Sequence, residues 1–307
     1  MTVRSLDFLD LPLLPRFGRD LLVLDSAQAL TQGSLLGVRT LLASLVPHHP
    51  LHTAVCMQDG LALIGQIVLK EDEASARLTF LAPSERVPDL ALPLLDHLAA
   101  HSGEWGALHL LSEVDENQPA FNALRQAGFA MYARQRVWKL AEVTAQTVDN
   151  GWQPAGDADW NTVQSLHAQI VPALIQPVAP LPKLPSGLVC RTQTGLQAYV
   201  GVTRGSRGIW LQPLIPPDSS CPAARLASLV QYVQAGTHLP VYLCVRSYQA
   251  WLEAGLSELG ALAHPPQAVM VRRLARTIKE SQLIRSPEKN LAKAKPAAPV
   301  ARSTSER

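Results

Sequence analysis

The run Leu78-Thr79-Phe80-Leu81, with the residues that follow it up to 140, decides the fold. It is short, apolar and rich in residues that favour β-structure, and helical and strand patterns alternate behind it. In order, these are a polar loop at 82–89, a helix at 90–101, a strand at 108–112, a helix at 117–126 that stops at Gly128, and a strand at 129–140. This order predicts an α/β fold of the α+β kind, with a mixed sheet.

The chain before this stretch supplies further strands of the same sheet. Residues 3–6 have a strand pattern, and so do the runs 52–57, 61–69 and 76–81. Because short polar turns join these three runs, we expect them to form an antiparallel meander.

The chain after residue 151 resembles a second copy. The same order of elements recurs from 152 to 274, with Leu229-Val230 in the place of Leu94-Leu95 and Gly260 in that of Gly128. The last residues have no apolar period and predict disorder. We therefore expect a first domain at 1–145, a second domain of similar topology at 151–278, and a disordered tail at 279–307.

Two spacings in the first copy resemble the GNAT family of acyltransferases, which use acyl-coenzyme A. The family pattern Arg/Gln-x-x-Gly-x-Gly/Ala is matched in spacing by Arg86-Val-Pro-Asp89-Leu-Ala91. A second pattern, Asn-x-x-Ala-x-x-x-Tyr-x-x-x-Gly-Phe, is matched from Asn117 to Phe129. Asp89 stands where the family has its first loop glycine, and Leu124 stands where it usually has tyrosine. The chain is thus similar to a tandem, diverged pair of GNAT domains.

This resemblance implies that acetyl-CoA binds to the first copy. In the family, the loop before the long helix presents backbone N–H groups to the coenzyme A pyrophosphate, and the helix N-terminus adds a partial positive charge. Parallel strands that splay apart leave main-chain groups free for the pantetheine amides. The residues implied to bind the cofactor are Leu81, Ala82, Arg86, Val87, Asp89, Ala91 and Asn117.

Some of these positions have a second interpretation. Asp89 would put a carboxylate beside the phosphates, a repulsion of about 1 kcal/mol at 4 Å in water, or else it caps a helix that starts at Leu90. Asn117 either contacts the pantetheine arm or caps the next helix. The second copy reads Cys221-Pro-Ala-Ala224-Arg-Leu226 in the loop, without glycine, so we expect no coenzyme A there.

The resemblance also implies a chemistry in which an amine attacks the thioester while a base takes its proton and an acid protonates the thiolate. Glu113 is a candidate base, with Asp115 and Glu116 beside it, and Tyr132 is a candidate acid because Leu124 cannot serve. One interpretation is an N-acetyltransferase that moves acetyl from acetyl-CoA to an amine of a small molecule or protein. The other is a catalytically degenerate binding or scaffold protein without turnover.

Composition argues against several classes of protein. The formal charge is +2 without a clustered basic patch, so we expect no nucleic-acid partner. The sequence has no signal-peptide pattern and no run of ~18 apolar residues, which predicts a cytoplasmic protein that does not bind membranes. The four cysteines form no CxxC pair, and His48-His49 has no evident third ligand, so no metal site is predicted.

Overall fold

The computed structural model describes residues 1–7, 10, 17, 20–33, 51–70, 73–140, 151–181, 187–193, 195–217, 222–235 and 237–274. These residues belong to one unit, Met1–Arg276. The predicted disordered tail at 279–307 lies outside the described residues. In the described part of the chain, no helix is both long enough and apolar enough to cross a membrane.

The first half of the chain forms the predicted strands and helices. Its strands are β1 (Thr2–Ser5), β2 (Leu22–Val23), β3 (Leu51–Gln58), β4 (Leu61–Val68), β5 (Ser75–Ala82), β6 (His109–Val114) and β7 (Ala130–Leu140). Its helices are α2 (Ser26–Gln32), α4 (Val87–Glu104) and α5 (Pro119–Gln126). The meander predicted from sequence is present, because β3, β4 and β5 pair antiparallel in chain order.

The second half repeats this order except at two short strands, since among the described residues β2 has no counterpart there and β13 has none in the first half. Its strands are β8 (Trp152–Pro154), β9 (Gly187–Thr192), β10 (Gly195–Arg204), β11 (Ile209–Leu214), β12 (Val241–Arg246), β13 (Leu262–Ala263) and β14 (Gln267–Arg273). Its helices are α6 (Trp160–Ile170), α7 (Pro222–Gln234) and α8 (Leu252–Glu258). Gly128 and Gly260, which the sequence paired, both follow the equivalent helices α5 and α8 and both have positive φ, at 81° and 70°.

The strands of both halves join in one mixed sheet. Its order is β1-β3-β4-β5-β6-β14-β7-β12-β11-β10-β9-β8. By their order in the chain, β1, β3, β4, β5, β6 and β7 are equivalent to β8, β9, β10, β11, β12 and β14. When each strand is exchanged for its equivalent, the strand order reads the same from both ends of the sheet. Such an order indicates an internal repeat related by an approximate two-fold axis, and the axis passes between β14 and β7.

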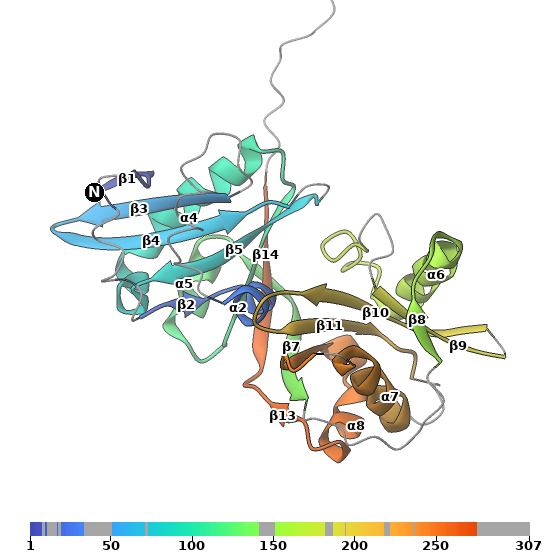
Figure 1. Ribbon diagram of the computed structural model, residues 1–307. Coiled ribbons are helices and arrows are strands. Elements are labelled where there is room, and N and C mark those ends of the chain that lie inside the picture. The colour runs from blue at the N-terminus through green and yellow to red at the C-terminus, as the bar shows by residue number, and fades with distance from the viewer. Residues whose placement is uncertain are drawn as a thin grey trace, which may run out of the picture. The chain divides into compact units, whose positions relative to one another are not determined.

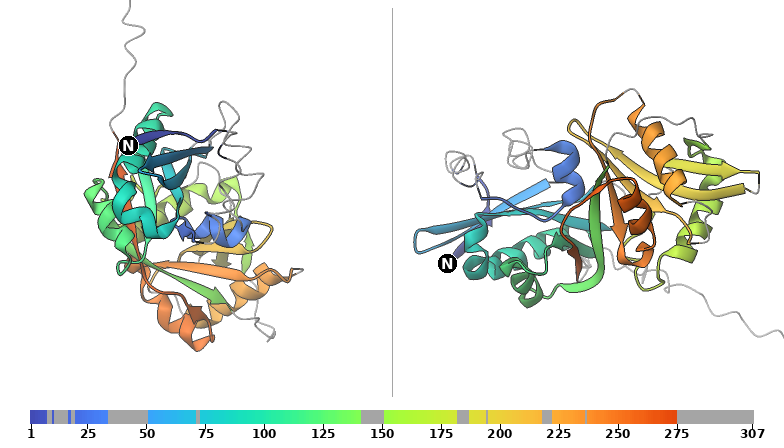
Figure 2. Two further views of the ribbon diagram at one scale, coloured as in Figure 1. Left: turned by 90° about the vertical axis from the view of Figure 1, so that its left-hand side faces the viewer. Right: turned by 90° about the horizontal axis from the view of Figure 1, so that it is seen from below.

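The last strand of each half lies in the other half's part of the sheet. β14 pairs antiparallel with β6 and β7, while β7 pairs antiparallel with β12 and β14. Figures 1 and 2 show β14, coloured orange-red, among the strands of the first half. The apolar cores are exchanged accordingly, because Ala268 and Met270 pack into the first core and Trp138 and Leu140 into the second.

This exchange bears on the domain boundaries. The predicted division into 1–145 and 151–278 stays a prediction, since residues 141–150 lie outside the described part. What the structure adds is that neither core is built from its own half alone. Each core needs a strand from the other half.

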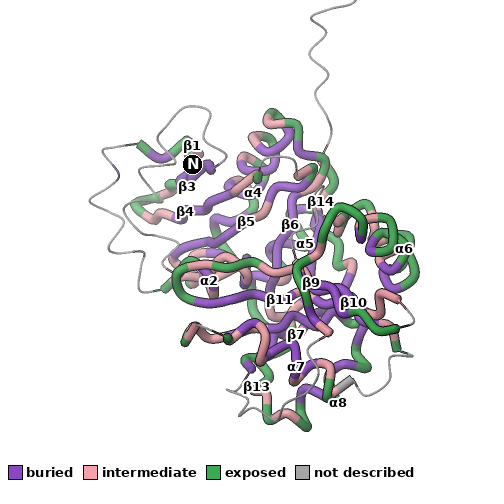
Figure 3. Tube along the Cα trace, turned by 45° about the vertical axis from the view of Figure 1, so that its right-hand side comes forward, coloured by how far each residue is buried: buried purple, intermediate pink, exposed green. Residues whose placement is uncertain are grey.

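Helix α4 covers one face of the first half's sheet. Leu94, Leu95 and Leu98 on α4 are buried against β3 and β4, as their helical spacing predicted. Gly65 on β4 permits this close contact, because a Cβ there would lie 3.0 Å from the Leu98 side chain and 3.3 Å from that of Leu94. The buried tube segments in Figure 3 follow these central strands and the inner side of α4.

Candidate functional site

The parallel strands β5 and β6 separate after a short ladder. Their paired residues are Ser75 with His109, Ala76 with Leu110 and Arg77 with Leu111. Past Arg77, β5 instead pairs antiparallel with β2, through Leu81 with Leu22 and Phe80 with Val23. The predicted splay is therefore present, but a strand of the same chain lies against it.

Leu24 connects the two separated strands. Its backbone N–H donates to the carbonyl oxygen of Thr79 on β5, at 2.9 Å, and its own carbonyl accepts the N–H of Glu113 on β6, also at 2.9 Å. The Leu24 side chain is 1% exposed. Residues 22–24 thus use the main-chain groups that the resemblance assigned to the pantetheine arm.

Asp20 is hydrogen-bonded to the start of the loop that leads from β5 into α4. Its carboxylate accepts the Ser84 hydroxyl at 2.6 Å and the Glu85 N–H at 3.3 Å, and its carbonyl accepts the Ser84 N–H at 3.0 Å. The hydrogen bond from Ser84 lowers the pKa of the Asp20 carboxyl. An ionised carboxylate therefore lies against the first residues of this loop, where it would repel a second anion.

The second half has an equivalent splay that is bridged by a side chain. The parallel ladder of β11 and β12 ends at Leu211 with Leu243. The Gln249 amide then donates to the carbonyl of Pro213 at 2.9 Å and accepts the N–H of Ile215 at 3.2 Å. By ladder register, Pro213 corresponds to Thr79, since each lies four residues after the first paired residue of its strand. Equivalent carbonyls are thus satisfied from within the chain in both halves.

The residues that the sequence assigned to the cofactor lie in two kinds of environment. Four of them are buried in the apolar cores, namely Leu81, Ala82, Val87 and Ala91. Arg86 is paired with its neighbour Glu85 at 3.1 Å, and Asp89 is exposed. Whether any of these residues contacts a cofactor stays a prediction.

Three local interpretations change. The long helix begins at Val87 and not at Leu90, so Asp89 lies in its first turn and is not the N-cap. Asn117 does not cap α5 either, because its backbone and side-chain nitrogens donate to Asp115 and Gln118 occupies the cap position. Leu124 is fully buried in the first core, which explains an apolar residue there.

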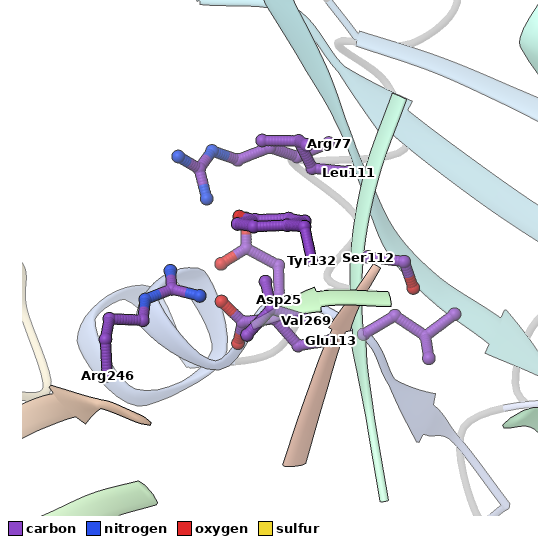
Figure 4. Close-up of a pocket in the computed structure, with 9 residues that line it drawn as sticks. Asp25, Arg77, Leu111, Ser112, Glu113, Tyr132, Arg246 and Val269 are labelled. Carbon is purple, nitrogen blue, oxygen red and sulfur yellow. The ribbon is translucent and has the colours of Figure 1, made fainter. Parts of the chain in front are cut away.

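Glu113 and Tyr132, the two candidate catalytic residues, lie in one buried cavity near the two-fold axis. The cavity holds about 10 Å³, room for about one water molecule. Figure 4 shows the guanidinium groups of Arg77 and Arg246 on either side of the Tyr132 ring, with the carboxylates of Asp25 and Glu113 close by. Glu113 lies on β6, is buried and accepts the Ser26 N–H at 3.0 Å, so it is not exposed to solvent.

Both arginines of the cavity remain charged. Burial by itself lowers the pKa of Arg246, but Tyr132, Cys244 and Glu113 outweigh it, and the net effect is a raised pKa. The Arg246 Nε and Nη1 atoms are buried without a hydrogen-bond partner. The cavity can therefore hold a water that these donors share with the carboxylates, but it has no room for a thioester or an amine substrate.

Sequence reasoning did not identify Asp20–Asp25 as part of the site. The signal was present, because the four apolar residues between these two acids form a short continuous run of the kind found in buried strands. Its strand partner could not be identified from sequence, since β2 pairs with residues about 60 positions away.

Comparison with known proteins agrees with the fold. No family model and no curated protein matches the chain. The solved GCN5-related N-acetyltransferase from Sphaerobacter thermophilus matches with a TM-score of 0.52 and 11% identity, over 89% of this chain and 95% of that one. A tandem GNAT protein from the clavulanic acid biosynthesis pathway, solved without AcCoA, has a TM-score of 0.49, 13% identity and coverages of 90% and 99%. A putative acetyltransferase from Pyrococcus horikoshii matches with a TM-score of 0.47 and 11% identity, over 89% of this chain and 89% of that one.

The chain therefore has the fold of the GNAT acetyltransferases, with a mixed sheet and an internal repeat. At 11% sequence identity, this structural similarity shows the fold and gives no information about activity. The residues present do not fit acetyl-CoA in the conformation described, because Leu22–Leu24 and Asp20 occupy its expected place in the first half and Gln249 does so in the second.

Proposed function

We propose that this chain is a GNAT-fold binding or scaffold protein that does not transfer acetyl groups from acetyl-CoA. One observation carries the proposal, namely the double hydrogen bond of Leu24 to β5 and β6. An acyl-CoA chain that entered the splay would have to break both bonds and expose the buried Leu24 side chain. Breaking them without replacement would leave four backbone groups unsatisfied, the N–H and C=O of Leu24, the C=O of Thr79 and the N–H of Glu113, at about 1–3 kcal/mol for each one that stays buried.

Two further observations support a role without turnover. Leu124 takes the position at which the resemblance implies a tyrosine acid, and it is part of the core. Glu113, the candidate base, already accepts the Ser26 N–H and lies in a cavity too small for a substrate. This cavity therefore does not take up the amine acceptor of an acetyltransferase. We propose that the binding partner contacts another part of the protein surface.

Calorimetric titration of acetyl-CoA into the full chain tests the proposal, combined with amide hydrogen exchange of Leu24 and Glu113. We expect no heat of binding at millimolar ligand, and both amides should stay equally protected with and without it. The Leu6 amide, which is bonded to Thr53 in the same half, serves as the control. Micromolar binding, or faster exchange at Leu24 together with transfer of acetyl to any amine, would overturn the proposal.

A further inference from the structure

A groove opens in the second half between helix α6 and the stretch that follows it, residues 171–181. Its volume is about 450 Å³, within the range of about 300–1,000 Å³ that is usual for small-molecule sites. The helix residues that line it follow one another at intervals of four and three, so they share one face of α6. Trp160, Gln164 and His167 lie on the helix side, and Gln176, Pro180 and Leu181 lie on the other.

The apolar part of the groove is supported by buried residues. Trp160 and Leu181 both pack against the core cluster that contains Val163, Leu166 and Tyr199. Because this cluster fixes both side chains, the apolar wall is present before a ligand arrives. Binding therefore does not have to order it, which lowers the entropy cost of binding.

Hydrogen bonds connect the two walls of the groove. The His167 Nε2 lies 3.0 Å from the carbonyl oxygen of Ala179, and the Gln176 amide donates to the carbonyl oxygen of Val171 at 2.9 Å. In the same stretch, Val178 is buried in a cluster with residues of β6 and β7 from the first half and of β14. The stretch is thus fastened on both sides, and the groove is preorganised.

These bonds determine which hydrogen-bonding atoms stay available to a ligand. A carbonyl only accepts, so the His167 Nε2 carries the proton. Burial lowers the pKa of this ring, which is therefore neutral near pH 7 and keeps a lone pair on Nδ1. Gln176 keeps its Oε1 as an acceptor. The exposed Gln164 amide makes no hydrogen bond among the described residues, and it can both donate and accept.

The chemistry of the lining favours an uncharged ligand with hydroxyl groups. Among the described residues, none that lines the groove carries a formal charge. A phosphate or carboxylate would lose water there without meeting a cation, which is unfavourable. Hydroxyl groups donate and accept, as the two amides and the imidazole require. The indole of Trp160 beside Leu181 offers apolar area to the C–H face of a ring.

We propose that this groove binds an uncharged sugar of one or two rings, with its C–H face on Trp160 and its hydroxyl groups on Gln164, His167 and Gln176. The inference rests on the proposed binding role, for which it names a class of ligand. The two fail in different experiments, because calorimetry with acetyl-CoA decides the first and titration with sugars decides the second.

The test is a titration of the ¹⁵N-labelled full chain with glucose, galactose and N-acetylglucosamine at millimolar concentrations, followed by the NMR signals of the indole N–H groups. The variant Trp160→Phe assigns the Trp160 signal by its loss. We expect at least one of the three sugars to shift this signal to saturation in the parent. Glucose 6-phosphate, which carries the charge that the lining does not match, should bind no more tightly than glucose.

Two glutamine variants on α6 separate this groove from the rest of the helix surface. Gln164→Ala removes an exposed amide without an internal bond, so the fold should be kept and the sugar affinity should fall about threefold or more with the lost hydrogen bond. Gln169→Ala changes an exposed glutamine of the same helix that does not line the groove, and it should bind like the parent.

Three results would overturn the proposal. The first is that none of the three sugars shifts the Trp160 signal. The second is that glucose 6-phosphate binds more tightly than glucose, which would mean that the groove recognises an anion. The third is that Gln164→Ala and Gln169→Ala bind the sugar alike.

Discussion

The backbone N–H of Leu24 donates to the carbonyl oxygen of Thr79 at 2.9 Å, inside the space that two diverging parallel strands leave open. In the second half the equivalent carbonyl, that of Pro213, accepts the amide of Gln249 at 2.9 Å. One half therefore fills its splay with backbone and the other with a side chain. This difference makes each half separately testable.

Replacing Gln249 with alanine should destabilise the protein by about 1–3 kcal/mol, because the Pro213 carbonyl and the Ile215 N–H would both lose a buried partner. Asn117→Ala is the matched control, since Asn117 follows the end of β6 by three residues, as Gln249 follows the end of β12, but is exposed. We expect the control to change the free energy of unfolding by no more than about 0.5 kcal/mol. Urea denaturation measures both, and equal effects would contradict the assigned role of Gln249.

Replacing Asp89 with glycine should not create acetyl-CoA binding. Asp89 is exposed in the first turn of α4, where its charge favours the helix, and the splay remains occupied by Leu22–Leu24. We expect a loss of about 0.5–1 kcal/mol in stability from the glycine and from the missing charge. Calorimetry with acetyl-CoA, run beside thermal unfolding, checks both parts; a gain of affinity would show that Asp89 guards an open site.

The first half should not fold alone. A chain of residues 1–145 lacks β12, β13 and β14, so β7 loses its pairing partners, β6 keeps only β5, and Ala268 and Met270 are missing from the core. We expect the fragment to show no cooperative unfolding transition, and co-expression with 151–278 to restore one. Circular dichroism during denaturation measures this. A cooperative transition of 1–145 by itself would mean that the strand exchange is dispensable.

The stability of the chain should depend on His52 below neutral pH. Its pKa is about 3 in the folded state, against an ordinary value of 6.5 in the unfolded chain. The unfolded state therefore binds the proton first, so the stabilising contribution is complete above pH 6.5 and is lost as the pH falls from 6.5 toward 3. The variant His52→Phe should show a weaker fall over this range. Urea midpoints measured across it test this, and parallel curves for parent and variant would refute it.

Local features of the fold were determined by the sequence itself. Leu94, Leu95 and Leu98 specify the buried face of α4 through their spacing, and Gly128 and Gly260 end equivalent helices because both adopt positive φ. The repeated order of elements predicted the internal repeat that the strand order displays. These features depend on interactions within a few residues, which a sequence pattern records directly.

Tertiary structure alone decided which strands pair and what fills the candidate site. The exchange of β7 and β14 and the insertion of Leu22–Leu24 beside β5 consist of backbone hydrogen bonds between distant residues, and such bonds leave no mark on side-chain patterns. Tertiary packing also decided the position of His52 beside His97. These residues are distant in the sequence, and the packing of α4 on β3 brings their ring centroids to 5.9 Å from each other. Alternation of side chains specifies which face of a strand is buried, but the choice of neighbour depends on how all strands compete for the sheet.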